Sequence, residues 1–118
     1  MDYFNNLNSK IFMKNSKLIE ALNNCVAHCN YCADACLGED NIKMMVDCIR
    51  TDRACAEICS ATANLLASNY KDVRGMVEQC RDICKKCADV CAKHDHKHCQ
   101  ECADACRKCE EACNEYLK

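Results

Sequence analysis

Cysteine thiols are the side chains with the most chemical potential in this chain, which has 16 of them among 118 residues. Five occur between Cys99 and Cys113, at successive steps of three, four, three and four residues. Residues three and four apart lie on one face of an α-helix, so this spacing predicts a stripe of sulfur along one side of a helix. Such thiols could bind soft metal ions, form disulfides, or fill a core as small apolar side chains.

Similar spacing occurs in three earlier stretches. Residues 25–36 and 80–91 each carry four cysteines at steps of four, three and four, and residues 48–59 carry three, with Asp52 between the first two. Sixteen cysteines in one register are too many for ordinary core packing, because aliphatic residues would fill a core as well. We therefore predict that all of them are metal ligands: Cys25, Cys29, Cys32, Cys36, Cys48, Cys55, Cys59, Cys80, Cys84, Cys87, Cys91, Cys99, Cys102, Cys106, Cys109 and Cys113.

Four helices are needed to carry these stripes. They are predicted, in chain order, at about 16–37, 41–68, 71–93 and 95–117. Residues 1–14 form an N-terminal segment that could be a short helix or an extension of the next one, and we expect Gly38 and Asp95 to cap helix ends. Short turns between helices of this length predict one all-α domain over residues 1–118, an antiparallel up-down-up-down four-helix bundle with a cysteine-lined core.

An up-down topology places the first and third turns at the same end of the bundle. The third turn contains three alternating histidines, and the second helix begins with a methionine on its cysteine stripe; both residue types bind soft or borderline metals. We predict that these side chains form a metal-binding mouth: His94, His96, His98 and Met45. Aliphatic residues gather at the opposite end and should form an apolar plug: Leu18, Leu22, Leu65, Leu66, Val73, Met76, Val77 and Leu117.

The remaining composition narrows the function. A formal charge of −2 gives no reason to expect nucleic acid or an anionic membrane as a partner, and no window approaches the roughly 18 apolar residues of a membrane span. The first 22 residues do not resemble a signal peptide, so we expect a cytosolic protein whose thiols stay reduced. No arrangement of nucleophile, base and orienting residue indicates an enzyme.

Cu(I) is the metal that best suits an unbroken column of thiols. Structural zinc sites use separable groups of four ligands, iron–sulfur clusters usually draw cysteines from loops, and di-iron bundles need Glu-x-x-His motifs that the sequence lacks. Cu(I) is soft, accepts two or three sulfurs, and offsets buried thiolate charge about one for one. The alternatives are a general thiolate buffer for zinc or cadmium and a thiol–disulfide redox protein.

The cysteine-bearing stretches resemble the bacterial copper storage proteins, which are Cys-rich four-helix bundles. The similarity extends from about Cys25 to Cys113, through CNYCADAC, DCIRTDRACAEIC, CRDICKKCADVC and HCQECADACRKCEEAC. It implies storage of many Cu(I) ions by cysteine, passage of the ions by histidine and methionine at one end, and a homo-oligomer, commonly a tetramer. The lack of an export signal resembles the cytosolic branch of that family.

Two further polar residues lie beside the stripes. Asp52 would either hydrogen-bond a thiol or bind copper weakly, or else form a salt bridge with an arginine such as Arg53. His28 is flanked along its helix by Cys25 and Cys32, and we predict a surface or interface residue there, with a ligand role as the alternative.

Overall fold

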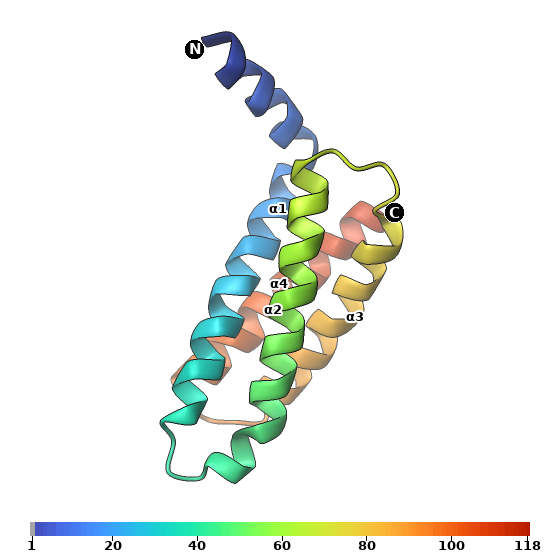
Figure 1. The fold of residues 1–118 in the computed structure, drawn as a ribbon. Helices are drawn as coiled ribbons and strands as arrows, with labels where there is room; N and C mark the ends of the chain where they lie inside the picture. Colours follow the sequence, from blue (N-terminus) through green and yellow to red (C-terminus); the bar gives the residue numbers. More distant parts are fainter. Residues whose placement is uncertain (1) are drawn as a thin grey trace.

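The computed structural model describes the backbone of residues 2–118 and the side chains from Asn15 onward. Within these residues the chain forms four α-helices and one short 3-10 helix (Figure 1): α1 Asp2–Leu37, η1 Ile42–Met45, α2 Val46–Ala67, α3 Arg74–Cys91 and α4 Lys97–Leu117. The prediction of an all-α four-helix fold is confirmed. No helix in the described part of the chain is long and apolar enough to cross a membrane.

Neighbouring helices run in opposite directions. Cys25 lies 3.7 Å from Cys55 and Cys32 lies 4.0 Å from Cys48, so α1 and α2 pass each other antiparallel. Sulfur contacts between α2 and α3, and between α1 and α4, follow the same order. Figure 1 shows the α1–α2 and α3–α4 turns together at the end of the bundle away from the C-terminus. The histidine-bearing turn therefore lies beside the turn that precedes η1.

The predicted N-terminal segment and first helix are continuous, apart from a kink. At Asn15 the backbone angles φ and ψ are −126° and 17°, which are not helical. From Asn15 onward, where the side chains are described, the first buried side chain of α1 is Leu18. The side chains of 1–14 lie outside the described residues.

Two predicted caps are wrong. Gly38 does not have the positive φ of a left-handed glycine cap; its N–H instead donates to the carbonyl of Ala35 at 3.1 Å, in a tight last turn. Asp95 does not cap α4, because the N-cap residue is His96, whose extended backbone (ψ 139°) presents its carbonyl to the N–H groups of Cys99 and Gln100. α3 also begins three residues later than predicted, after a left-handed Asn69 (φ 60°) has ended α2.

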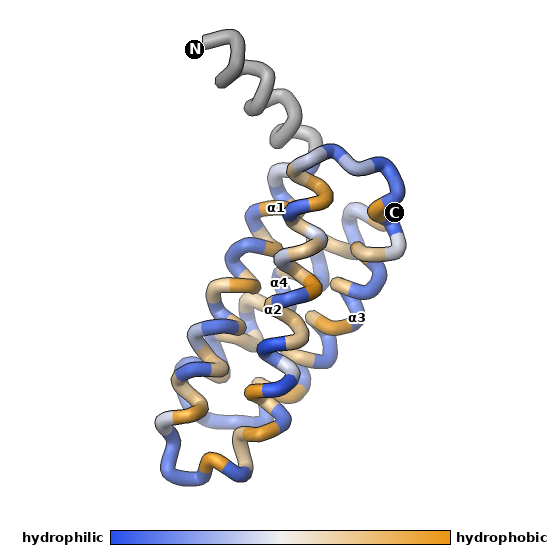
Figure 2. Tube along the Cα trace, viewed as in Figure 1, coloured by the Kyte–Doolittle hydropathy of each residue, from blue (hydrophilic) through white to orange (hydrophobic). Residues whose placement is uncertain are grey.

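The core has an aliphatic end and a sulfur-lined remainder. Figure 2 shows hydrophobic and hydrophilic residues alternating along each helix, as expected for helices with one buried face. At the end near the C-terminus the predicted plug is present: Leu18, Leu22, Leu66, Val73 and Val77 are buried, and Leu65, Met76 and Leu117 pack partly buried against them. Beyond Leu22, the inward positions belong almost entirely to cysteine.

Candidate metal centre

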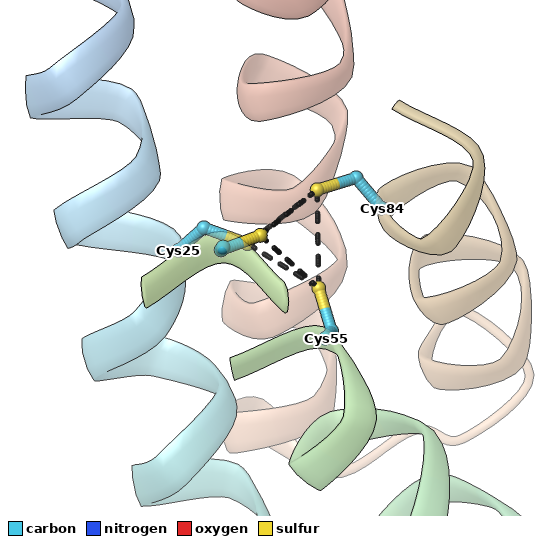
Figure 3. Close-up of side chains that lie close together, drawn as sticks. Cys25, Cys55 and Cys84 are labelled. Carbon is cyan, nitrogen blue, oxygen red and sulfur yellow. Dashed lines mark hydrogen bonds between the residues drawn. The ribbon is translucent and has the colours of Figure 1, made fainter. Parts of the chain in front are cut away.

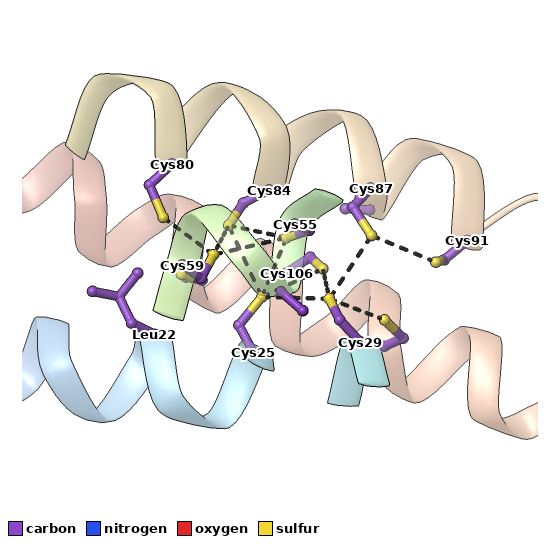
Figure 4. Close-up of a cluster of buried hydrophobic side chains, with 14 of the residues drawn as sticks. Leu22, Cys25, Cys29, Cys55, Cys59, Cys80, Cys84, Cys87, Cys91 and Cys106 are labelled. Carbon is purple, nitrogen blue, oxygen red and sulfur yellow. Dashed lines mark hydrogen bonds between the residues drawn. The ribbon is translucent and has the colours of Figure 1, made fainter. Parts of the chain in front are cut away.

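All sixteen cysteines are buried, with no exposed surface, and each is a free thiol. Their spacing on each helix turns every sulfur toward the bundle axis, where Sγ–Sγ contacts range from 3.1 Å to 4.0 Å. The dashed contacts in Figure 4 run from Cys80 to Cys91 along α3, linked through sulfurs of the other helices. We call this set of sixteen buried thiols the sulfur column.

The middle of the sulfur column draws one thiol from each helix. Cys25 lies 3.7 Å from Cys55 and 3.9 Å from Cys84, which are themselves 3.8 Å apart (Figure 3). Cys106 from α4 adds a contact of 3.7 Å to Cys25. Several groups of four such sulfurs lie within 4.8 Å of one another, close enough for one ion to be held by two or three of them.

The closed end of the column stops at the plug. Cys80 and Cys59 make the shortest thiol contact, 3.1 Å, and Cys59, Cys80, Cys84 and Cys109 form a group that could hold a metal ion. Figure 4 places the Leu22 side chain beside Cys59 and Cys80, at the boundary between carbon and sulfur.

At the opposite end, one histidine joins the sulfur atoms. His98 Nδ1 lies 3.3 Å from the sulfur of Cys32 and 3.5 Å from that of Cys99. With Cys36, these residues form a mixed sulfur and nitrogen group whose ligand atoms lie within 4.8 Å of one another. The other ring nitrogen of His98, Nε2, lies 3.0 Å from a carboxylate oxygen of Glu39. We call this end the mouth.

The other predicted mouth residues take different places. The His96 ring stacks on His98, with centroids 5.4 Å apart, and lies 3.5 Å from Glu39 through Nδ1. Met45 is buried in the core, whereas His94 is half-buried in the turn. Among the side chains the structure describes, His98 is the one histidine with a ring nitrogen within hydrogen-bond distance of sulfur.

Asp52 lies inside the sulfur column and is fully buried. Its carboxyl group accepts hydrogen bonds from Cys87 at 3.1 Å, from Cys91 and Cys102 at 3.3 Å each, and from Cys48 at 3.6 Å. No arginine or lysine pairs with it among the described side chains, so the structure favours the thiol-bonded alternative over the salt bridge. Burial, reinforced by the surrounding sulfurs, raises the pKa of Asp52 to about 11.

Burial also favours the protonated form of the thiols at the mouth. It raises the pKa of Cys99 to about 12 and also raises that of Cys36 above its ordinary value. A metal that binds these sulfurs must therefore displace protons, because thiolate is the form that ligates metals. Metal uptake by the column is consequently an exchange of cations for protons.

Glu39 is the site residue that sequence reasoning missed. It lies in the turn that follows α1, and the Gly-Glu-Asp-Asn sequence suggested only a chain reversal with caps. The signal was available in the topology, since an up-down bundle places this turn next to the histidine turn.

His28 is half-buried on α1, between Cys25 and Cys29 in the chain.

Comparison with known sequences gives consistent matches over most of the chain. A family model described as "Copper storage protein" (Csp) matches residues 12–118. An uncharacterized cysteine-rich protein of Bacillus subtilis (strain 168), YhjQ, is 41% identical over 82 residues, which are 70% of this chain and 76% of that protein.

Solved structures with a similar fold include proteins carrying copper. A cytosolic copper storage protein of Streptomyces lividans, with five coppers, has a TM-score of 0.84 at 39% identity, covering 95% of this chain and 96% of that chain. The Cu(I)-bound copper storage protein BsCsp3 has a TM-score of 0.84 at 38% identity, covering 87% of this chain and 97% of that chain.

Proposed function

The chain belongs to the copper storage protein family, and from that premise we propose that it stores many Cu(I) ions in its sulfur column. The observation that carries the proposal is the column itself, in which sixteen buried free thiols face the bundle axis and groups of four sulfurs lie within 4.8 Å of one another. Storage suits this arrangement because a bridging sulfur can serve two ions, so filling can continue along the axis.

Electrostatics favour Cu(I) over divalent ions. Each thiol that binds metal becomes a thiolate, and a buried thiolate is costly unless a cation neutralises it. Monovalent copper restores neutrality at roughly one ion per thiol, and each ion needs only two or three sulfurs. Zinc or cadmium would reach neutrality at about half that number and would require four ligands each. Family membership likewise favours copper over a zinc or cadmium buffer or a disulfide exchanger.

We assign all sixteen cysteines as ligands. At the mouth, His98 contributes Nδ1 beside Cys32 and Cys99, and His96 acts from outside through its stacking and its contact with Glu39. We keep Met45 as a ligand because it is buried at this end of the core, and His94 as an outer contact on the route to it. Asp52 would give up its thiol hydrogen bonds as copper fills the sulfurs around it.

The protein would work in the cytosol as a binding protein rather than an enzyme. The similar storage protein of Streptomyces lividans is described as cytosolic, which supports this location. The family resemblance implies a homotetramer. Exposed apolar side chains such as Tyr31 and Met44 are surfaces that a neighbouring copy would cover. Light scattering should give about four times the chain mass of 13.3 kDa, and a monomeric mass would contradict the tetramer.

Anaerobic titration of the reduced protein with Cu(I), in competition with a chelator, tests the storage function. We expect the bound copper to rise far beyond a single site before free chelator complex accumulates. Saturation at one or two ions would overturn storage. Zinc that resists displacement by Cu(I) would favour the divalent buffer, and disulfides in protein isolated without reductant would favour redox exchange.

A further inference from the structure

A carboxylate stands directly outside the sulfur column at its mouth. Glu39 Oε1 lies 3.0 Å from Nε2 of His98, and Oε2 lies 3.5 Å from Nδ1 of His96. The turn that carries it is tied to the column, because the Glu39 backbone N–H donates to the carbonyl of Cys36 at 3.2 Å. The backbone of Glu39 is therefore anchored to the residue whose thiol belongs to the mouth, Cys36.

This contact determines which nitrogen of His98 can reach a metal. An ionised carboxylate has no proton to donate, so a neutral His98 must carry its proton on Nε2. Its Nδ1 then has a free lone pair, directed at the sulfurs of Cys32 (3.3 Å) and Cys99 (3.5 Å). In this tautomer the imidazole faces the thiols as a ligand.

The geometry of His96 indicates that Glu39 holds the imidazole of His98, and that Glu39, His96 and His98 do not form a second metal site. The His96 and His98 rings are stacked and nearly parallel, with an angle of 4° between their planes. Imidazole lone pairs lie in the ring plane, so two parallel rings do not direct their nitrogens at one ion. A carboxylate has two separate oxygens, and here Oε1 bonds to His98 Nε2 at 3.0 Å while Oε2 lies 3.5 Å from His96 Nδ1.

We propose that Glu39 is a positioning residue for copper uptake, which holds His98 so that Nδ1 faces the thiols of the mouth. Partners of this kind fix the tautomer and ring orientation of a metal-binding histidine and raise its basicity. The proposal rests on the proposed storage function for its role in uptake. The tautomer and orientation of His98 in the metal-free protein can be tested without copper.

The metal-free test is NMR of the imidazole nitrogens at about pH 8, where histidine is ordinarily neutral. We expect His98 to be wholly the Nε2–H tautomer, with its Nε2–H proton protected from exchange with water. Glu39→Ala should remove this protection, Glu39→Gln should keep part of it through its amide oxygen, and Asp40→Asn should leave it unchanged. A proton on Nδ1, or equal protection in Glu39→Ala, would overturn the proposal.

The second test is the rate at which reduced protein takes its first Cu(I) from a weak chelator. Glu39→Ala should slow this step by about tenfold or more, the usual effect of losing such a partner, with total capacity unchanged. Asp40→Asn removes the same charge from the adjacent exposed position, and Glu39→Gln should be intermediate. Equal slowing in Asp40→Asn and Glu39→Ala would indicate simple charge attraction and overturn positioning. Saturation of the wild type at one or two ions would instead refute storage, leaving the NMR result standing.

Discussion

Each cysteine sulfur can make weak thiol hydrogen bonds and can bind metal. In the metal-free protein only the weak thiol contacts are present. Thiols are poor hydrogen-bond donors and acceptors, so contacts such as the 3.5 Å between Cys59 and Cys84 stabilise the fold little. The same contacts place sulfurs close enough to share an ion. Asp52 is the exception within the column, because its carboxyl group engages four thiols.

The buried carboxyl group of Asp52 should make the metal-free protein less stable as the pH rises. In the unfolded chain it ionises near its ordinary pKa of 3.8, whereas in the fold its pKa is raised to about 11. Between these values the folded state keeps a proton that the unfolded state has lost, so the free energy of unfolding falls with increasing pH. Asp52→Asn should remove this dependence, which for one proton amounts to about 1.4 kcal/mol per pH unit, and should raise the free energy of unfolding at pH 8.

Urea unfolding of the reduced, metal-free protein at several pH values between 5 and 8 measures this effect. Below the window where thiols ionise in the unfolded chain, the two proteins should diverge steadily with pH. Asp40→Asn is a suitable control, since Asp40 is exposed. A wild-type stability that rises with pH in this range would contradict the burial of a protonated Asp52.

At the scale of the helix, the cysteines at the two ends of α4 should affect different properties. One should control the rate of copper capture and the other the copper capacity. Cys99 lies at the mouth beside His98, whereas Cys113 lies at the far end of the same stripe, near the plug. Cys99→Ser should slow capture of the first Cu(I), because that ion meets the mouth before any other site. Cys113→Ser should leave the first step unchanged and lower the final capacity by about one ion.

Stopped-flow capture and equilibrium titration on the same two variants measure rate and capacity. Both substitutions replace sulfur with oxygen in a buried position on one helix, so each controls for the other. If Cys113→Ser slowed the first step as much as Cys99→Ser, copper would enter from both ends of the bundle.

The aliphatic plug should supply much of the stability that the thiols do not. Leu22 is fully buried at the boundary with the sulfur column, and Leu22→Ala should destabilise the metal-free protein by about 2–5 kcal/mol through lost burial and a cavity. Leu37→Ala is the matched control on the same helix: Leu37 is 48% exposed, so its loss should cost within about 0.5 kcal/mol. Equal midpoints in denaturant unfolding would show that the plug does not stabilise the bundle.

The helices themselves could be predicted from spacing, because four stripes in one register leave few alternative folds. The starts of the second, third and fourth helices could not, since local preference was outweighed there by tertiary contacts. Asp95 is a good capping residue, yet His96 takes the position, and His96 is also the residue that meets Glu39 and stacks on His98. A histidine near the thiols could be predicted from the sequence. That His98 is the histidine beside the sulfurs of Cys32 and Cys99 depends on side-chain geometry that spacing does not determine.

For the molecule as a whole, bound copper should stabilise a bundle whose core contains few aliphatic side chains. Only 20 of the 118 residues are Leu, Ile, Val or Phe, so the metal-free bundle buries little aliphatic surface for its size. Ions that bind the folded column and not the unfolded chain add stability in proportion to the logarithm of their excess over the dissociation constant, about 4 kcal/mol at a thousandfold excess.

The midpoint temperature of thermal unfolding should therefore rise stepwise with copper content. We expect a difference of about 15 °C or more between the metal-free and filled protein, since 1 kcal/mol corresponds to about 4–8 °C in a domain near this size. Circular dichroism at 222 nm, recorded anaerobically at increasing Cu(I) per chain, measures the midpoint. Cys113→Ser should follow the wild type at low loading and fall below it near saturation, because the site it lacks lies deepest. A midpoint that is independent of copper would mean that the ions bind outside the core, and the sulfur column would then not be the store.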